Sequence, residues 1–238
     1  MTVAIVIAGG VGSRMGADIP KQFVQVNGKP VLFYTLEAFE RHPMVDAIEL
    51  VCIDGWQDAA AAYGKQYGIS KLRWIVKGGA TGQESIRNGV FALEGQCAAS
   101  DVVVVHDGIR PLVDAAVLDD VISKARQFGN GVTSMPYNEQ IFLIDEEDPT
   151  TTSKYIPRET LRRVATPQAY RFDLLDQAYH EAFEKKIGIY GSSYTNTMMV
   201  ELGHKLHFAV GSDRNIKLTT PGDLEIFRAY LGSRLNHE

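Results

Sequence analysis

Short, nearly continuous apolar runs alternate along the chain with longer segments in which apolar residues recur at helical spacing. The apolar runs cover residues 3–8, 47–53, 72–78, 101–107 and 131–137, and most are rich in valine and isoleucine. Runs of this length with few polar interruptions are typical of strands that are covered on both faces of a parallel sheet. We expect these segments to form the central sheet of the protein.

Helices are predicted between the strands, most clearly over residues 31–42 and 84–95. In both segments the apolar residues are three or four positions apart, which places them on one helical face. These residues are Leu32, Leu36 and Phe39 in the first helix and Ile86, Val90 and Leu93 in the second. The alternation indicates βαβ units, and hence a doubly wound α/β fold with a mostly parallel sheet. Ligands of such folds bind beyond the C-terminal ends of the strands.

The alternation breaks at residues 138–158, NEQIFLIDEEDPTTTSKYIPR, where a short apolar run meets an acidic turn and a threonine-rich cluster. This pattern predicts a β-hairpin that projects from the sheet as an arm, although a mobile surface loop is the alternative for so polar a stretch. The apolar run at 141–144 is costly to leave in water, so we expect the arm to pack on a second subunit. Because the chain has no linker or internal repeat, we expect one domain over residues 1–238.

Composition narrows the possible partners. The 238 residues carry a net charge of −5, and charged residues make up 22% of the chain, so the sequence indicates neither a basic nucleic-acid surface nor an acidic tail. No apolar run approaches the roughly 20 residues that span a bilayer, so we expect no membrane segment. Cys52 and Cys97 lack the spacing of a zinc or redox motif and lie among apolar residues. They are therefore expected to be buried thiols in a reducing cytoplasm.

A glycine-rich loop follows the first predicted strand. Gly9, Gly10 and Gly12 allow a tight turn in which several backbone N–H groups face one point, as in phosphate-binding loops. The loop does not match the GxxxxGK[ST] motif, and Met15 replaces the third glycine of the dinucleotide motif GxGxxG. A glycine turn of this kind is often only a packing turn.

Two cations make phosphate binding the better interpretation of this loop. Arg14 and Lys21 flank its exit, and Pro20 stiffens the connection between them. Together with backbone donors, two positive charges suit a triphosphate, whose β- and γ-oxygens gain charge as pyrophosphate leaves.

Further candidate residues lie near the ends of later elements. His106, Asp107 and Arg110 lie at the end of a buried strand, where an aspartate can hold a divalent metal or a hydroxyl and an arginine can bind a phosphate. The alternative is a purely structural Asp–Arg pair, and His106 is expected to be a packed residue rather than a base. Lys217 lies in a short apolar segment that we expect to be a strand, where a lysine needs an anionic partner.

A run of arginines completes the set. Arg158, Arg162 and Arg163 lie close together, and at least one of them is expected to belong to a solvated face. The five cations assigned to the site exceed the need of one phosphate, so two anionic substrates are expected. These cations are Arg14, Lys21, Arg110, Arg158 and Lys217.

Five segments of the chain, in order, resemble the motifs of the polyol-phosphate cytidylyltransferases. The matching segments are AGGVGSRMG followed by PKQF, KGGATGQESIRNG, HDGIRP, ATPQ and NIKLTTPGDL, between residues 8 and 224. The family contains 2-C-methyl-D-erythritol 4-phosphate and ribitol-5-phosphate cytidylyltransferases. The resemblance implies a Rossmann-like nucleotidyltransferase fold, a homodimer joined by exchanged arms, Mg²⁺ dependence, and transfer of CMP from CTP to a polyol phosphate with release of pyrophosphate.

The resemblance also implies roles for individual residues. Arg14, Lys21 and Lys217 would be catalytic, and Asp107 would bind both the metal and the substrate. The nucleotide would be bound by Ala8, Gly9, Gly10, Gly12, Gly79 and Ser85. The acceptor would be bound by Asp107, Arg110, Gln140, Arg158 and Thr195, with Arg158 supplied by the arm of the partner subunit.

The sequence departs from the family pattern mainly near the acceptor. Gln140 stands where a threonine is expected, and Asn196 and Thr197 replace an acidic pair that is common in the erythritol-phosphate enzymes. Ala80 replaces an acidic residue that contacts the base in some relatives. The identity of the polyol, and so the choice between an isoprenoid and a cell-surface polymer pathway, stays open.

Two other functions remain as alternatives. A dinucleotide-dependent oxidoreductase is possible for this class of fold, but the dinucleotide motif and its ribose-binding acid are lacking. A nucleotide-binding module without turnover would not need the whole cationic set.

Overall fold

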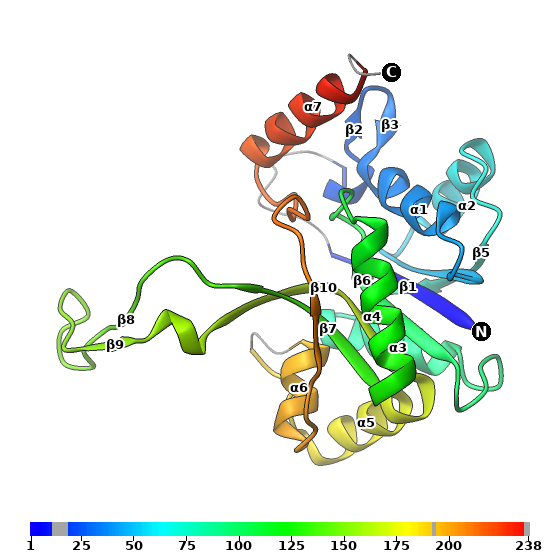
Figure 1. Ribbon diagram of the computed structural model, residues 1–238. Coiled ribbons are helices and arrows are strands. Elements are labelled where there is room, and N and C mark those ends of the chain that lie inside the picture. Colours follow the sequence, from blue (N-terminus) through cyan, green and yellow to red (C-terminus); the bar gives the residue numbers. More distant parts are fainter. Residues whose placement is uncertain (11–18, 192–193, 236–238) are drawn as a thin grey trace.

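The computed structural model describes residues 1–10, 19–191 and 194–235, which are built around a central sheet (Figure 1). Within these residues the sheet has seven strands in the order β11-β7-β10-β6-β1-β4-β5. The strands are β1 (Thr2–Ala8), β4 (Ala47–Cys52), β5 (Leu72–Lys77), β6 (Val102–Asp107), β7 (Asn130–Pro136), β10 (Arg162–Arg171) and β11 (Phe208–Val210). Only β10 runs antiparallel to its neighbours. The prediction of a mostly parallel sheet is therefore confirmed, and all five expected strands belong to it.

Helices cover both faces of this sheet. They are α1 (Val31–Arg41), α2 (Gln57–Gln66), α3 (Gly82–Ala92), α4 (Ala115–Phe128), α5 (Phe172–Lys185), α6 (Thr195–Glu201) and α7 (Pro221–Leu235). α1, α2 and α4 pack on one face of the sheet, whereas α3, α5 and α6 pack on the other. α7 packs across α1 and beside the short β2–β3 hairpin (Gln25–Val26 and Lys29–Pro30). Among the helices described, none has the length and apolar character needed to cross a membrane.

The alternating sides of each strand explain why the strands are apolar throughout. In β1, Ala4 and Val6 belong to the core under α1 and α4, whereas Val3 and Ile5 belong to the core under α3 and α5. A strand in such a position exposes neither face to water, so both sets of side chains must be apolar. The apolar faces expected for the helices at 31–42 and 84–95 are buried as predicted.

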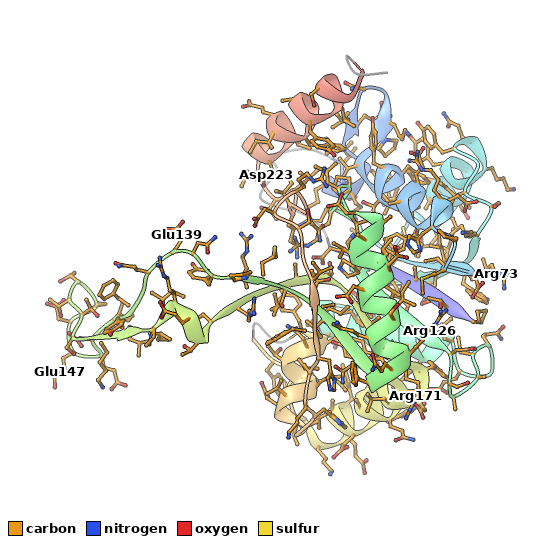
Figure 2. The ribbon with its side chains drawn as sticks, in the orientation of Figure 1. Arg73, Arg126, Glu139, Glu147, Arg171 and Asp223 are labelled. Carbon is orange, nitrogen blue, oxygen red and sulfur yellow. The ribbon has the colours of Figure 1, made fainter. Side chains whose placement is uncertain are left out.

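The predicted hairpin arm is present between β7 and β10. β8 (Ile141–Leu143) and β9 (Lys154–Ile156) pair antiparallel, and the arm extends far to one side of the sheet (Figure 1). Glu139 and Glu147 mark its course in Figure 2. Its apolar side chains are largely uncovered: Phe142, Ile144 and Tyr155 expose 55%, 70% and 67% of their surface.

The strand expected around Lys217 is a wrong prediction. Residues 215–220 have no regular secondary structure and cross the C-terminal edge of the sheet, with Leu218 N donating to Ile109 O at 2.9 Å. Because this segment runs across the strand ends and not alongside a strand, it cannot form the repeated backbone hydrogen bonds of strand pairing. The helix start expected beyond it is present, because Asp223 accepts hydrogen bonds from the Thr219 and Thr220 N–H groups at the beginning of α7.

One buried carboxyl group, that of Glu49, makes no ion pair within the described part of the chain. Glu49 of β4 is fully buried under α3, where a Cβ on Gly89 would come within 2.7 Å of Glu49 Oε1. Neither oxygen has a hydrogen-bond partner among the described residues. Burial raises the pKa of Glu49 to about 8, so the group is protonated in the folded protein at neutral pH.

This burial predicts a pH-dependent stability. The folded protein keeps the Glu49 proton up to about pH 8, whereas the unfolded chain loses it near the ordinary value of 4.5. The free energy of unfolding should therefore fall between pH 4.5 and pH 8, by up to about 4 kcal/mol. In urea titrations, Glu49→Gln should remove this decline and be more stable than the wild type at pH 8.

The exposed substitution Glu184→Gln is the matched control and should follow the wild-type curve. If Glu49→Gln had the wild-type pH dependence, the buried group would have to be ionised in the folded state.

Candidate active site

A cavity of about 800 Å³ lies at the C-terminal edge of the sheet. β1 lies there between β4, to which the chain crosses first, and β6, to which it returns after β5, so the strand order reverses at this point, which is where α/β folds bind ligands. The wall consists of residues 7–10, 77–82, 105–107, 164–166 and 194–196, with Lys21, Gln22, Ile53, Asp54, Ser85, Ile86, Ile109, Arg110, Gln168 and Lys217. The cavity thus brings together parts of all five motifs singled out in the sequence.

The first glycine loop is held by a buried side chain and a close backbone approach. Gln22 Nε2 donates to Ala8 O at 2.7 Å and to Gly10 O at 3.1 Å, which fixes the chain as it leaves β1. At Gly9 a Cβ would lie 2.9 Å from Ser85 Oγ, so a larger residue would push the two loops apart. The close approach to Ser85 thus explains the glycine at position 9, and the two backbone hydrogen bonds explain the amide side chain at position 22.

The cations predicted around this loop are only partly within the described residues. Lys21 lines the cavity, next to Gln22 in a short 3₁₀ helix (Lys21–Phe23). Gly12 and Arg14 lie outside the described residues, so their predicted roles stay predictions.

The second glycine loop is fixed by the start of α3. The Glu84 carboxylate accepts hydrogen bonds from Ala80 N at 2.7 Å and Thr81 N at 3.1 Å, and Thr81 Oγ1 accepts from Glu84 N at 3.1 Å. This capping box holds the loop at a fixed angle to the helix. Ser85 Oγ accepts from Gly79 N at 3.0 Å and donates to Thr81 O at 2.9 Å. The Ser85 hydroxyl can therefore accept one more hydrogen bond but cannot donate one.

A three-residue charge cluster lies at the end of β6. Asp107 Oδ2 is 2.9 Å from Arg110 Nε and 3.2 Å from Lys217 Nζ. Burial alone would raise the pKa of Asp107, but the positive charges of Lys217 and Arg110 and the Arg110 hydrogen bond lower it to about 2. Asp107 is therefore ionised, and it pairs with Lys217 as well as with Arg110, the partner that the purely structural alternative gave it.

Backbone contacts connect this triad to the rest of the site. Arg110 Nη1 donates to Asn215 O at 2.8 Å, and Asn215 Nδ2 donates to Thr166 O at 2.7 Å. Thr166 Oγ1 in turn accepts from Asp107 N at 3.1 Å. β6, β10 and the 215–217 segment are thereby locked together around the two cations.

His106 is a packed residue, as the sequence predicts. It is fully buried, its ring packs against Phe39 at 5.2 Å between centroids, and Nε2 lies 3.1 Å from Arg110 O. Burial lowers the pKa of His106 to about 4, so the imidazole is neutral at pH 7. A neutral Nε2–H donating to Arg110 O positions the arginine backbone and leaves His106 no part as a base.

The start of α6 forms another part of the wall. Thr195 Oγ1 lies 2.8 Å from the buried hydroxyl of Tyr179, which donates to Gln83 Oε1 at 3.0 Å. Thr197 Oγ1 bonds the Tyr194 backbone and does not line the cavity, and the Tyr194 ring lies 5.8 Å from Lys217 Nζ. Among the departures noted in the sequence, only Ala80 and Asn196 line the cavity.

Two predicted acceptor residues lie outside the cavity of their own chain. Gln140 is exposed on the arm, and Arg158 lies in a 3₁₀ helix of the arm (Arg158–Thr160), where Nη1 donates to Asn138 O at 3.4 Å. Neither lines the cavity.

Sequence reasoning assigned no role to Gln22, Thr166 and Asn215, although the structure gives each a positioning hydrogen bond. All three lie inside the quoted motifs PKQF, ATPQ and NIKLTTPGDL. Their membership in those motifs is the signal that could have identified them.

Comparison with known proteins agrees with this geometry. Residues 2–233 match the family model for 2-C-methyl-D-erythritol 4-phosphate cytidylyltransferase. A ribitol-5-phosphate cytidylyltransferase of Lacticaseibacillus paracasei is 58% identical over 231 residues, which cover 97% of this chain and 98% of the relative. A 2-C-methyl-D-erythritol 4-phosphate cytidylyltransferase of Geobacter metallireducens is 36% identical over 235 residues, with 98% of each chain covered.

Solved structures give the same result. The crystal structure of a 4-diphosphocytidyl-2C-methyl-D-erythritol synthase from Anaerococcus prevotii superposes with a TM-score of 0.82 at 25% identity, covering 98% of this chain and 96% of that chain. The resemblance found in the sequence is confirmed, and so is the nucleotidyltransferase fold. The chain belongs to the 2-C-methyl-D-erythritol 4-phosphate cytidylyltransferase family and is a cytidylyltransferase.

Proposed function

We propose that this protein transfers CMP from CTP to ribitol 5-phosphate, giving CDP-ribitol and pyrophosphate. The observation that carries this proposal is the pair of cations, Arg110 and Lys217, held by Asp107 beside two glycine loops. The 58% identity with a ribitol-5-phosphate cytidylyltransferase supports the choice of acceptor. Both cysteines are free thiols, which fits a cytoplasmic enzyme.

The second glycine loop is a suitable binding site for the cytosine base. Residues 78–82 and Ser85 line the cavity, and the Ser85 hydroxyl has only an accepting position left. A base that presents an amino donor, as cytosine does, can fill that position, whereas a base with a carbonyl there cannot. Gly79 and Ser85 are thereby proposed to bind the base, and Ala8, Gly9, Gly10 and Gly12 to bind the phosphates.

The reaction needs no covalent intermediate. A phosphate oxygen of the acceptor forms a bond to the α-phosphorus of CTP, and the bond from that phosphorus to the bridging α–β oxygen breaks, so both electrons leave with pyrophosphate. Lys217 and Arg110 neutralise charge that develops on the α-phosphate, while Lys21 and Arg14 neutralise the departing pyrophosphate. Fixed charges of this kind accelerate phosphoryl and nucleotidyl transfer mainly through positioning and electrostatics.

A magnesium ion fits this site in the way it fits many nucleotide enzymes. Mg²⁺ usually takes one or two protein carboxylates and completes its coordination with water and phosphate oxygens. Asp107 would supply one ionised carboxylate in the cavity. Oxygens of the triphosphate and water would supply the remaining ligands. When bound, the ion supplies Lewis-acid polarisation of the phosphate oxygens.

The choice of acceptor can be tested by pyrophosphate release. With CTP and Mg²⁺, the protein should turn over ribitol 5-phosphate at least tenfold more efficiently than 2-C-methyl-D-erythritol 4-phosphate, measured as kcat/KM. ATP, GTP and UTP serve as controls for the base. Preference for the erythritol phosphate would contradict the proposed acceptor, and CTP binding without release from either acceptor would favour a nucleotide-binding module.

We further propose that the protein is one domain over residues 1–238 that forms a homodimer through the arm at 138–158. The exposed apolar side chains of the arm need a cover, and a second copy of the chain provides one. Arg158 and Gln140 do not line the cavity of their own chain, which supports their reaching the acceptor site of the partner.

Mixing two inactive variants tests this exchange. Arg158→Ala and Lys217→Ala should each lower turnover about 100-fold, as expected for the loss of one preorganised charge. If Arg158 acts across the dimer, a heterodimer of the two variants contains one intact site. An equimolar mixture that has exchanged subunits should then recover about a quarter of wild-type turnover, because half of the dimers are heterodimers.

Each variant mixed with itself and taken through the same exchange is the control. No recovery in exchanged heterodimers would mean that Arg158 acts within its own chain or not at all.

A further inference from the structure

A second hollow, of about 330 Å³, adjoins the cavity on the far side of Lys217. Both spaces are lined by Arg110, Val164, Ala165 and Lys217, so these residues mark their junction. The glycine loops and Lys21 line the first cavity but not the second. The two proposed reactants must meet beside the two cations, so a nucleotide bound by the glycine loops leaves the second hollow to the acceptor.

The wall of this hollow is fixed by close packing. At Gly211 a Cβ would lie 2.6 Å from Met135 Cγ and 2.9 Å from Ser134 O, so the segment after β11 lies directly against β7. Asp223 also lines the hollow, but its carboxylate is occupied by the N–H groups at the start of α7. The hollow is therefore a preformed feature of the fold.

One polar group in the wall is not explained by the packing. Asn215 lines the hollow and is 5% exposed, and its Oδ1 is buried without a hydrogen-bond partner among the described residues. The amide oxygen of Asn215 therefore keeps an unused accepting position. Ser212 lines the same wall, and its Oγ accepts from Arg214 N at 3.3 Å.

The Arg163–Asp213 ion pair also lines the hollow. Arg163 comes from β10 at the root of the arm and Asp213 from the segment that leads to Lys217. The guanidinium also contacts Met135 Sδ at 3.4 Å, which orients it along the wall. About half of the Arg163 side chain and most of the Asp213 side chain stay exposed, so both keep hydrogen-bonding positions for a ligand.

From this we infer that Arg163 and Asp213 are specificity-determining residues that bind the hydroxylated chain of the acceptor. The inference rests on the proposed function. The Asp213 carboxylate accepts hydrogen bonds from polyol hydroxyls and the Arg163 guanidinium donates to their oxygens, while the phosphate end of the acceptor lies at the junction beside Arg110 and Lys217. An acceptor with more hydroxyl groups along its chain gains more from this pair than a shorter or methylated one.

Direct binding of ribitol 5-phosphate, measured by calorimetry together with steady-state kinetics, tests the inference. Arg163→Ala and Asp213→Ala should each raise the Kd and KM for ribitol 5-phosphate about tenfold, the effect expected for losing hydrogen bonds to a charged group, with the KM for CTP unchanged. Arg162→Ala is the matched control, because Arg162 is the exposed neighbour on β10 and lines neither space. It should bind ribitol 5-phosphate like the wild type.

The charge-reversed double variant Arg163→Asp with Asp213→Arg distinguishes direct binding of the acceptor from a purely structural role of the ion pair. It can restore an ion pair, so a merely structural bridge would regain wild-type affinity for ribitol 5-phosphate, and that result would overturn the inference. Recognition by these two groups predicts that the affinity stays low while the melting temperature recovers. Wild-type-like affinity in both single variants would also overturn it, as would a wild-type protein that does not bind ribitol 5-phosphate. Binding that depends on Arg163 without any turnover would overturn the proposed reaction alone.

Discussion

The ion triad of Asp107, Arg110 and Lys217 is the interaction on which the site depends. Two cations that face one cavity repel each other, and the ionised carboxylate between them holds both in place at 2.9 and 3.2 Å. The same residues are tied through Asn215 and Thr166 to three separate parts of the chain. Positive charge is thereby fixed before a substrate arrives, so little reorganisation is needed during the reaction.

The sheet explains why this triad can be assembled. β6 ends at Asp107, and β10 runs antiparallel beside it, so the strand that carries Thr166 also leads back to the arm. One strand therefore connects the reacting centre, the junction of the two spaces and the apolar hairpin (Figure 1). Any change in the position of the arm acts on the same strand that borders the acceptor side of the site.

Much of this could be read from the sequence, for physical reasons. The central strands could be predicted because both of their faces are buried. The glycine loops could be predicted because their glycines directly follow short apolar strands. The prediction of a strand at Lys217 was wrong because a short apolar segment can be held by single contacts across a sheet edge, without the repeated hydrogen bonds of strand pairing. The Arg163–Asp213 pair could not be predicted, since its partners are 50 positions apart and nothing local to either marks the contact.

The substitution Asp107→Asn, assayed for CTP affinity and turnover together, tests the central claim most directly. If Asp107 serves to fix the two cations, removing its charge should leave CTP binding, measured without Mg²⁺ so that the proposed metal role of Asp107 does not enter, as tight as in the wild type or tighter, because the triphosphate no longer competes with a carboxylate. Turnover should fall about 100-fold, because the cations lose their fixed positions. Turnover close to that of the wild type would contradict the account, as would a loss of CTP affinity that explains the whole loss of activity.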